Sequence, residues 1–501
     1  MPLAVPALVM LLVVGALGFR LIGIDFGRPY VYHPDEYAIA KPGILMAHFN
    51  GWNPHAYYYP SALMYAEKAI AIAVHHFAHA PYESTIAYGF DTAAYRAYYE
   101  AIPEQFDFYL AGRILVAILG SLTVAITFAA GRAAAGLTGG FAAAIFVALA
   151  PLAVIHAHYL TTDVPATMFV ALALYLTIRG RDGGRTLIAS GLVAGLAAST
   201  KYNAGAVVIA PLVIALALPS PPMARVRLAA AVTLASVVGF AVLTPVVLID
   251  PGVILNALHG QVLTYSSRAG QTGGNSFGYW LDYLWSPALG PAFAIASVAG
   301  IVAAAVRRER TMVAILAFTV VYFVIVSFPS VRFERNLIPL FPALAILTGV
   351  ALADLVKRRR LAITAVAVAV FAIGAATALA ADVDNDLALM RPDPRTIALD
   401  WINANLPAGS RIAREDYSPQ PSPDRYEVGV IPFLSDHPLQ WYRDQKVDFL
   451  VASSYAYGWV IGPGEQFYRD LSALPLLFDI PPGPGTAVGP EIKVYDLRGS
   501  H

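Results

Sequence analysis

Cysteine is absent from the 501 residues of this chain, and charged residues make up only 13% of them. The absence of cysteine excludes disulfide bonds, thiolate metal sites and cysteine nucleophiles. A soluble domain carries about 25% charged residues, so this chain is not an ordinary globular protein. Lysine plus arginine balances aspartate plus glutamate at 33 each. This balance gives no electrostatic reason to expect nucleic acid as a partner.

Apolar residues take the place of the missing charges: 58% of the chain is hydrophobic, and the mean hydropathy is +0.61. The apolar runs have lengths close to the ~20 residues that a helix needs to span a bilayer. The sequence therefore predicts a polytopic α-helical membrane protein with about eleven transmembrane helices. The first run lacks a basic region and a clear cleavage site, so we expect a retained helix and not a signal peptide. The expected spans are 3–22, 108–131, 137–157, 162–179, 186–200, 203–218, 226–249, 287–306, 311–328, 336–356 and 361–381.

Short basic loops follow alternate spans, and such loops lie on the cytoplasmic side of a membrane. All five fall on one side if the spans alternate, which places the N-terminus inside and the chain after residue 381 outside. Abundant arginine and alanine are typical of a GC-rich bacterial gene, so the expected location is the bacterial cytoplasmic membrane. The loops are Gly131-Arg132, Arg179 to Arg185, Arg225 to Arg227, Arg307 to Arg310 and Lys357 to Arg360.

Two long segments are expected outside. The first outer loop, 23–107, carries helical patterning with interrupted apolarity at 36–49 and 60–79, which we expect to lie along the membrane surface. The tail, 384–501, is a composition break rich in proline, aspartate and arginine. It predicts a small extracytoplasmic α/β domain after a transmembrane domain of residues 1–383. The expected helix of the tail is 393–405, and the expected strands are 411–414, 447–452 and 492–497.

Acidic residues at outer span ends are the most informative polar residues. An acid at the centre of a span costs roughly 2.5–3.5 kcal/mol, so acids near the bilayer should face water, a partner or a site. Asp35 and Glu36 lie in the first outer loop, and Asp163 follows the third span. A carboxylate there can accept a proton from an attacking hydroxyl. The alternative is a helix N-terminus, where these residues act as caps or complement the dipole.

Histidines near these acids raise the question of a metal site. His156, His158, Asp163 and Asp35 could act as ligands. No strong metal signature such as His-Glu-x-x-His is present. A divalent metal ion is therefore an open question, and no other cofactor is indicated.

Basic residues at outer span ends run against the positive-inside tendency. Lys201 lies between two spans, and Arg332 and Arg335 precede the tenth. Lys41 and Arg268 are also expected outside. Such cations can hold a phosphate or pyrophosphate. The alternative is that they form ion pairs with neighbouring acids or reach the lipid headgroups.

Six segments that hold these acids and cations can be compared with a known family. They are Asp35-Glu36, Tyr59 to Tyr65, Gly112-Arg113, Pro151 to Pro165, Thr200-Lys201-Tyr202 and Arg332 to Pro342. As a set they resemble the bacterial members of the dolichyl-phosphate-mannose protein mannosyltransferase superfamily. These are the GT-C glycosyltransferases, which include the aminoarabinose transferases. The resemblance covers residues 1–381 and, more loosely, the tail.

The resemblance implies an enzyme that takes a sugar from a polyprenyl-phosphate carrier on the outer face of the membrane. It implies inverting transfer to a lipid, glycan or protein acceptor, with Asp35 as general base and Glu36 and Asp163 as supporting acids. The chain departs from the family where the lysine of its Pro-rich segment is Tyr59. If that lysine contacts the carrier phosphate in relatives, another cation must do so here, and Lys201, Arg332 and Arg335 are the candidates. The expected substrate-binding residues are His33, Lys41, Tyr59, His158, Lys201, Tyr202, Arg268, Arg332 and Arg335.

Two other functions are compatible with a membrane protein of this kind. A lipid or glycan transporter or flippase would place polar groups or broken helices near the midplane, whereas the mid-span regions here are almost uniformly apolar. A non-catalytic assembly protein would leave the outer acids and cations unexplained. The sequence favours the glycosyltransferase and identifies neither the sugar nor the acceptor.

Overall fold

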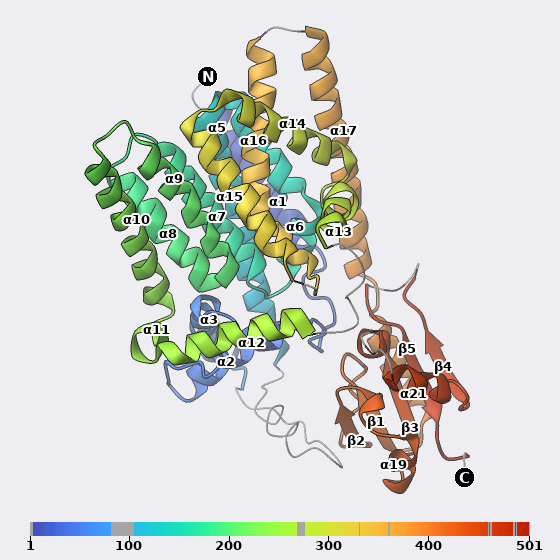
Figure 1. The fold of residues 1–501 in the computed structure, drawn as a ribbon. Helices are drawn as coiled ribbons and strands as arrows, with labels where there is room; N and C mark the ends of the chain where they lie inside the picture. The colour runs from blue at the N-terminus through green and yellow to red at the C-terminus, as the bar shows by residue number, and fades with distance from the viewer. Residues whose placement is uncertain are drawn as a thin grey trace.

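A helical bundle and a small α/β domain make up the chain in the computed structural model (Figure 1). The structure describes residues 4–499 except 82–104, 268–275, 330, 359–360, 459, 461–462, 484–485 and 487. The α/β domain lies beyond one end of the bundle, and the N-terminus lies near the other end (Figure 1).

Each apolar segment of the sequence is helical over most of its length. Six helices of the described residues are long and apolar enough to cross a membrane, and shorter apolar helices accompany them. The prediction of a polytopic helical membrane protein is confirmed, and the count of eleven crossings stays a prediction. The bundle helices are α1 (Ala4–Leu21), α5 (Phe106–Leu149), α6 (Pro151–Ile155), η1 (His156–His158), α7 (Asp163–Arg179), α8 (Arg185–Thr200), η2 (Tyr202–Val208), α9 (Ile209–Ala217), α10 (Pro222–Leu243), α11 (Val246–Ile249), α12 (Pro251–Ser267), α13 (Ser276–Tyr283), η4 (Leu284–Ala288), α14 (Pro291–Arg307), α15 (Arg310–Ser327), η5 (Glu334–Leu340), α16 (Phe341–Lys357) and α17 (Leu361–Leu389).

The second expected span and most of the third are the two arms of α5, which turns back at Gly136. Gly136 has a φ of 81°, a left-handed conformation that glycine adopts without steric cost. The arms touch through glycines, since a Cβ on Gly131 would lie 2.5 Å from the Gly139 carbonyl oxygen. A Cβ on Gly349 would lie 2.4 Å from that same oxygen. Helices α5 and α16 therefore also cross backbone to backbone.

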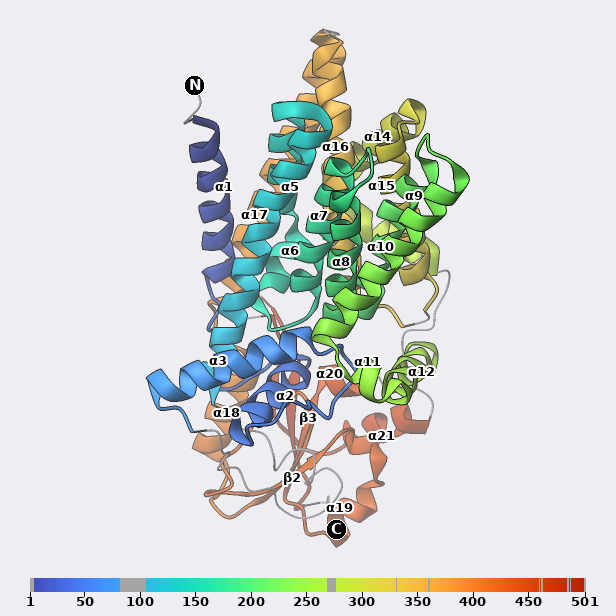
Figure 2. The same cartoon turned by 90° about the vertical axis from the view of Figure 1, so that its left-hand side faces the viewer.

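Helices α2 (Glu36–His48) and α3 (Ala62–Ala78) lie across the end of the bundle nearer the α/β domain (Figure 2). They form in the two segments where the sequence indicates surface helices. Their apolar faces share a core with the start of α5, which includes Ile44, Met64 and Phe108. Gly43 permits their close crossing, because a Cβ there would lie 2.6 Å from the Glu67 Cβ.

The α/β domain is built on a five-stranded sheet in the order β2-β1-β3-β5-β4. Strand β1 pairs in parallel with β2 and β3, and β5 is antiparallel to β3 and β4. The sequence predicts the helix α18 and three of the strands. It does not predict β2, which has a glycine at its centre, or β4, an edge strand with exposed residues. The elements are α18 (Pro394–Asn405), β1 (Arg411–Glu415), β2 (Glu427–Ile431), η6 (Leu434–Asp436), α19 (Leu439–Asp444), β3 (Phe449–Ser453), α20 (Ser454–Tyr457), α21 (Pro463–Leu471), β4 (Leu476–Ile480) and β5 (Ile492–Asp496).

The tail is fastened to the first outer loop. Helix α17 continues to Leu389, past the domain boundary expected from the sequence. Asp393 then caps α18 by accepting a hydrogen bond from the backbone N of Arg395 at 2.8 Å. Arg395 Nη1 donates to the carbonyl of Tyr32 at 2.9 Å, and its guanidinium lies 4.0 Å from the centroid of the Tyr32 ring. These contacts hold the backbone just before Asp35.

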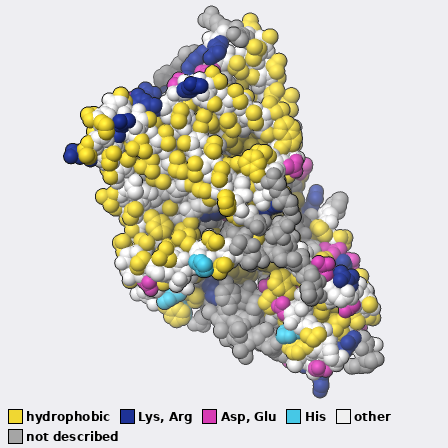
Figure 3. Space-filling view, viewed as in Figure 1, with side chains coloured by type: hydrophobic (Ala, Val, Ile, Leu, Met, Phe, Trp, Pro, Cys, Tyr) yellow, Lys and Arg dark blue, Asp and Glu magenta, His cyan; other side chains and the backbone are white. Residues whose placement is uncertain are grey.

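Charge is distributed unevenly over the molecule. On the face shown in Figure 3, lysine and arginine gather at the end of the bundle opposite the α/β domain, and the surface between is mostly hydrophobic. Helix α16 ends and α17 begins at that same end (Figure 1). This is the pattern that the positive-inside tendency describes. Which end is cytoplasmic stays a prediction.

Candidate active site

Two acids and two cations from separate segments meet at the end of the bundle that carries α2 and α3. Asp35 Oδ2 pairs with Arg335 Nη2 at 3.0 Å. Arg335 Nε lies 3.7 Å from Asp163 Oδ2. Asp163 Oδ1 accepts a hydrogen bond from Lys201 Nζ, which also donates to Asn336 Oδ1 at 2.6 Å. We refer to these five residues as the ionic network.

Asp35 occupies the N-cap position of α2, but its side chain does not cap the helix. Its backbone has a φ of −83°, and its side chain makes no capping hydrogen bond. The carboxylate faces Arg335 instead and keeps 26% of its surface exposed. The alternative of a helix N-terminus thus holds for the position of Asp35 but not for its carboxylate, which stays accessible to a substrate.

Asp163 and Lys201 are placed by the ends of two helices. Asp163 is the first residue of α7, and its side chain is only 2% exposed. Lys201 has an extended backbone, with φ −151° and ψ 121°, which separates α8 from η2. This break lets its side chain reach Asp163. A buried carboxylate is costly unless cations and hydrogen bonds compensate it, and Lys201 and Arg335 together supply that compensation.

Glu36, the neighbour of Asp35, has a different environment. Arg113 Nε and Nη2 donate to its two carboxylate oxygens at 2.8 Å each, and the backbone N of Leu160 donates to Oε1 at 2.8 Å. Arg113 Nη1 donates to two carbonyls of the chain after α1. Both side chains are fully buried. Glu36 therefore ties the first outer loop to α5, and the structure does not bring it into the ionic network.

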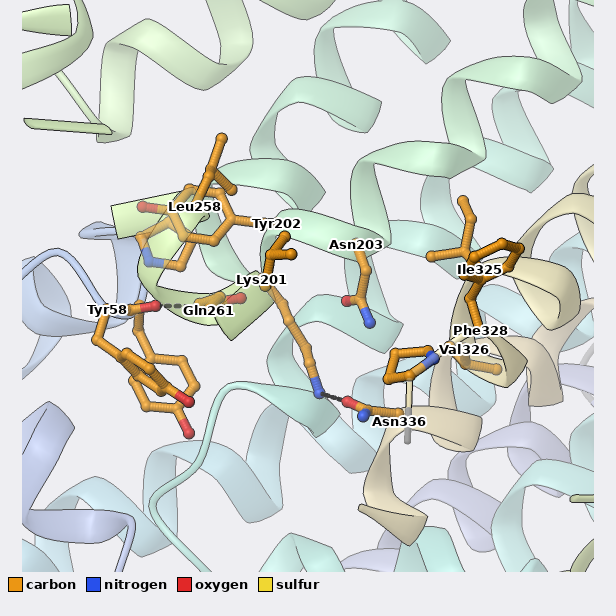
Figure 4. A pocket seen from close by; sticks show the side chains of 14 residues that line it. Tyr58, Lys201, Tyr202, Asn203, Leu258, Gln261, Ile325, Val326, Phe328 and Asn336 are labelled. Atoms are coloured by element: carbon orange, nitrogen blue, oxygen red, sulfur yellow. Dashed lines mark hydrogen bonds between the residues drawn. The ribbon is translucent and has the colours of Figure 1, made fainter. Parts of the chain in front are cut away.

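A cavity of about 530 Å³ lies beside the network (Figure 4). Lys201 and Asn336 line it together with Tyr59 and Tyr202, which were expected to bind substrate. Most of the remaining lining comes from apolar residues of α12 and the end of α15. Phe328 is 88% exposed, so one wall of the cavity reaches the bundle surface. The apolar residues are Leu258, Val262, Ile325, Val326, Phe328 and Pro329.

His33 and Lys41 lie in the first outer loop, and the backbone N of Asp35 donates a hydrogen bond to His33 Nδ1 at 3.3 Å. The His33 ring stacks on Tyr159 with 4.3 Å between centroids. Burial lowers the pKa of His33 to about 3, so this ring is neutral at ordinary pH. Burial also lowers the pKa of Lys41, on α2, to about 8.

Three more predicted residues lie elsewhere or cannot be placed. His158 has its ring nitrogens 3.0 Å from the carbonyls of Val154 and Ile22, and its Nε2 lies 3.5 Å from Asp386. The Arg332 guanidinium lies 4.5 Å from the Tyr279 ring centroid. Arg268 lies outside the described residues.

The residues proposed as metal ligands do not form a metal site. No group of three or more His, Asp or Glu side chains with metal-site spacing occurs in the described parts of the chain. His158 points to backbone carbonyls, and Asp35 and Asp163 direct oxygens to cations. His156 Nδ1 has no hydrogen-bond partner among the described residues, but one free nitrogen is too few for a divalent metal ion, which needs several oxygen or nitrogen ligands.

Some residues at the site carry no clear signal in the sequence. Asn336 lies next to Arg335, so the cationic segment of η5 could have indicated it. Gln261 of α12 donates to the carbonyl of Tyr58 and so helps close the cavity. Nothing in the local sequence marks Gln261, because its contact depends on how α12 folds across the bundle.

Comparison with known proteins finds a family that part of the chain resembles. Residues 107–249 match the sequence model of the family described as dolichyl-phosphate-mannose-protein mannosyltransferase. This stretch holds Asp163 and Lys201 but neither Asp35 nor Arg335. The match confirms the resemblance stated from the sequence. Among curated proteins, none matches the chain.

Solved structures share the whole architecture. ArnT from Cupriavidus metallidurans bound to undecaprenyl phosphate matches with a TM-score of 0.56 and 16% identity, over 99% of this chain and 98% of ArnT. Its apo state matches with a TM-score of 0.55 and 17% identity, over 99% of each chain. The archaeal oligosaccharyltransferase AglB from Archaeoglobus fulgidus, in complex with an inhibitory peptide and a dolichol-phosphate, has a TM-score of 0.56 and 12% identity, over 96% of this chain and 73% of AglB. These likenesses confirm the expected GT-C fold with its small C-terminal domain.

Proposed function

We propose that this chain, a multi-pass membrane protein with the GT-C fold, is a glycosyltransferase that moves a sugar from a polyprenyl-phosphate carrier to an acceptor. The observation that carries the proposal is the ionic network beside a cavity that reaches the bundle surface. An accessible carboxylate, two cations and an apolar wall are the groups that such a reaction needs. The carriers bound in the ArnT and AglB structures, undecaprenyl phosphate and dolichol-phosphate, support the choice of donor class.

The donor occupies the 530 Å³ cavity in this proposal. Its polyprenyl tail lies against Leu258, Ile325 and Phe328, where burial of apolar surface favours binding. Its phosphate lies near Lys201 and Arg335, which can donate charge-assisted hydrogen bonds to phosphate oxygens. Tyr59, in place of the lysine of the family motif, lines the same cavity.

Asp35 is the general base. The acceptor hydroxyl oxygen attacks the anomeric carbon, and the bond from that carbon to the phosphate oxygen breaks. The bonding pair leaves with the polyprenyl phosphate, and the hydroxyl proton passes to Asp35. A single displacement of this kind inverts the anomeric configuration. Lys201 and Arg335 stabilise the charge that develops on the leaving phosphate.

Asp163 supports this arrangement without touching the acceptor. It is too buried to take a proton from an incoming hydroxyl, and it holds Lys201 and the Nε edge of Arg335. Glu36 supports it from further away, because its pair with Arg113 fixes the backbone that carries Asp35. Both are positioning residues in this proposal.

The reaction takes place on the outer face of the bacterial cytoplasmic membrane. The network, α2, α3 and the tail lie at the end of the bundle away from the basic loops, which is the extracytoplasmic end by the positive-inside tendency. A reporter fused after His501 is expected to register as extracytoplasmic. A cytoplasmic signal would reverse this orientation.

The proposal is tested with the purified full-length protein in nanodiscs. Incubation with polyprenyl-phosphate sugars and an envelope extract as acceptor should release polyprenyl phosphate and give a new glycoconjugate, followed by mass spectrometry. The same glycan should disappear from cells that lack the gene. Movement of carrier between leaflets with no release of polyprenyl phosphate would instead support the flippase alternative.

A further inference from the structure

A second, smaller hollow lies between the first outer loop and the sheet of the tail. Its volume is about 80 Å³, which corresponds to a few water molecules at ~30 Å³ each. Tyr32 and Pro34 line it from the loop, and Arg414, Asp416 and Gln420 line it from the end of β1 and the chain after it. None of these residues lines the larger cavity. A hollow of this size admits a carboxylate or phosphate group and excludes a polyprenyl chain.

Arg414 is the residue that points to a ligand. Its side chain lies in the wall of the hollow, and the residue is only 8% exposed. Its Nε has no hydrogen-bond partner, and it forms no ion pair within the described residues. Its Nη1 has one long contact, 3.5 Å to the Glu415 carbonyl. A buried cation is costly without an opposite charge and hydrogen bonds, so an anion placed here would supply what the protein leaves out.

The other two charged residues that line the hollow, Arg395 and Asp416, differ from Arg414 in their partners or their exposure. Arg395 donates to both carboxylate oxygens of Asp393 at 2.7 Å and to the carbonyl of Tyr32. Asp416 also lines the hollow and is more exposed than Arg414, so water weakens its repulsion of an anion. Within the part of the chain that the structure describes, Arg414 is thus the cation of the hollow whose Nε has no hydrogen-bond partner.

The place of this hollow in the sheet also favours a ligand. Strand β1 has a parallel neighbour on each side, so the chain leaves β1 toward β2 and later returns on the other side to form β3. In open α/β sheets, ligands bind outside the carboxyl end of a strand at such a switch point. Tyr417 there has a φ of 59°, and Ser453 Oγ donates to its carbonyl at 3.0 Å. The loop is held in a conformation that non-glycine residues seldom adopt.

We propose that this hollow is an acceptor subsite that binds a carboxylate or phosphate group through Arg414. The proposal rests on the proposed function, which it deepens by giving the acceptor an anionic group. Pro34 lines the hollow and directly precedes Asp35, so an acceptor anchored at Arg414 has its neutral hydroxyl-bearing part beside the base. The contacts from Arg395 to Tyr32 keep the loop and the sheet together around the anion.

Binding is tested first without any sugar transfer. Hydrogen–deuterium exchange of the full-length protein in nanodiscs is followed while inorganic phosphate or acetate is titrated. We expect saturable protection of residues 411–420 in the wild type and in Arg411→Gln, a control on the same strand outside the hollow. Arg414→Gln should weaken the midpoint at least tenfold, because a charge-assisted contact is lost. Protection that is absent in the wild type, or unchanged in Arg414→Gln, overturns the proposal.

The two probes also distinguish the two ligand groups. Tighter binding of phosphate assigns a phosphate-bearing acceptor, and tighter binding of acetate assigns a carboxylate-bearing one. If Arg414→Gln does not fold, Arg414→Lys replaces it and should keep anion protection with a weaker midpoint, since it retains charge without the planar fork. Anion protection in Arg414→Lys equal to that of the wild type would contradict a guanidinium ligand.

Turnover provides the second readout. In a transfer assay, Arg414→Gln should raise the acceptor KM at least tenfold while the donor KM stays within about twofold. An unchanged acceptor KM would overturn the subsite. Absence of transfer in the wild type would count against the proposed function and leave the exchange result to decide on the anion site, so the two failures are distinguishable.

Discussion

The ionic network and a second cluster of charged residues in the bundle differ in what surrounds them. In the ionic network, each acid faces a cation, and the network borders a cavity. In the second cluster, Asp382 and Asp386 of α17 interact electrostatically with Arg20 of α1. The carboxylate oxygens of both aspartates have no hydrogen-bond partner among the described residues, although His158 Nε2 lies 3.5 Å from Asp386.

The second cluster is buried and lies outside both cavities described above. Arg20 is 1% exposed and donates to three backbone carbonyls, of Ala16, Val147 and Ala148. Asp382, Asp386 and Arg20 line neither of those two cavities, and a third cavity, of about 380 Å³, reaches Ala381 of α17 but is not lined by them. The comparison teaches that buried charge alone does not identify a site in a membrane protein. Access through a cavity and a set of complementary charges distinguish the two clusters.

Among variants of the two clusters, Asp35→Asn should lower turnover the most. Loss of the base is expected to lower kcat by roughly 10²–10⁴-fold, because the amide cannot take the hydroxyl proton. Transfer from a polyprenyl-phosphate sugar is the measurement, with the melting temperature as a check on folding. Asp107→Asn, at an exposed acid that pairs with Arg28, is the matched control and should retain activity. Near-normal turnover of Asp35→Asn would eliminate it as the base.

Glu36→Gln should affect stability more than chemistry. Removing one charge of the buried pair leaves Arg113 uncompensated, at an expected cost of about 3–5 kcal/mol. Thermal unfolding in detergent measures the loss. The fraction of the Glu36→Gln variant that remains folded should keep the donor and acceptor KM values of the wild type. A stable variant with abolished turnover would assign Glu36 a direct role in the reaction.

Arg335→Gln should reduce kcat by roughly 10²-fold, because one preorganised donor to the leaving phosphate is lost. Arg335→Lys should recover part of the activity, since the charge returns without the bidentate geometry. Arg332→Gln is the matched control on the same segment, where the guanidinium lies over Tyr279. Equal losses of kcat in Arg335→Gln and Arg332→Gln would mean that Arg335 has no special role in the reaction.

The pH dependence of stability should carry a smaller signal from His33. Its folded pKa of about 3 lies below the unfolded value of 6.5, so the unfolded chain binds the extra proton first. Stability from this residue is therefore full above pH 6.5 and is lost as the pH falls toward 3, by about 1.4 kcal/mol per pH unit. His33→Gln should flatten this part of the curve, followed by melting temperature against pH. An unchanged slope would mean that His33 titrates normally.

The smallest effect is expected in the second cluster. Asp382→Asn removes a carboxylate that touches no cavity, so turnover should stay within about twofold of the wild type. Transfer kinetics beside Asp35→Asn provide the direct comparison. A loss of activity as large as that of Asp35→Asn would break the distinction between the clusters.

The sequence predicts the ionic network better than it predicts how the network is supported. Asp35, Asp163, Lys201 and Arg335 could be selected because charge at the outer end of a span is costly and therefore informative. Their partners could not be assigned, since both Asp35 and Glu36 suit a helix N-terminus and only the fold decides which one meets Arg113.

Histidine and loop residues mark the other limit of the sequence. His158 lies close to Asp163 along the chain, yet η1 turns its ring toward the end of α1 and α17. No sequence motif marks Gln261 or Arg414. The role of Gln261 depends on how α12 crosses the bundle, and that of Arg414 depends on how the tail docks against the first outer loop. The long apolar runs, in contrast, locate the helices, because a helix that crosses a bilayer needs about 20 apolar residues.

The contact between Gly139 and Gly349 has a consequence at a distance. Helix α16 directly follows η5, which carries Arg335 and Asn336. Even a methyl group at residue 349 would meet the α5 backbone and force α16 aside, and η5 would move with it. Amino acids that never touch a substrate are thereby restricted to the smallest side chain, and the tolerance of this bundle to mutation should be lowest where two backbones meet.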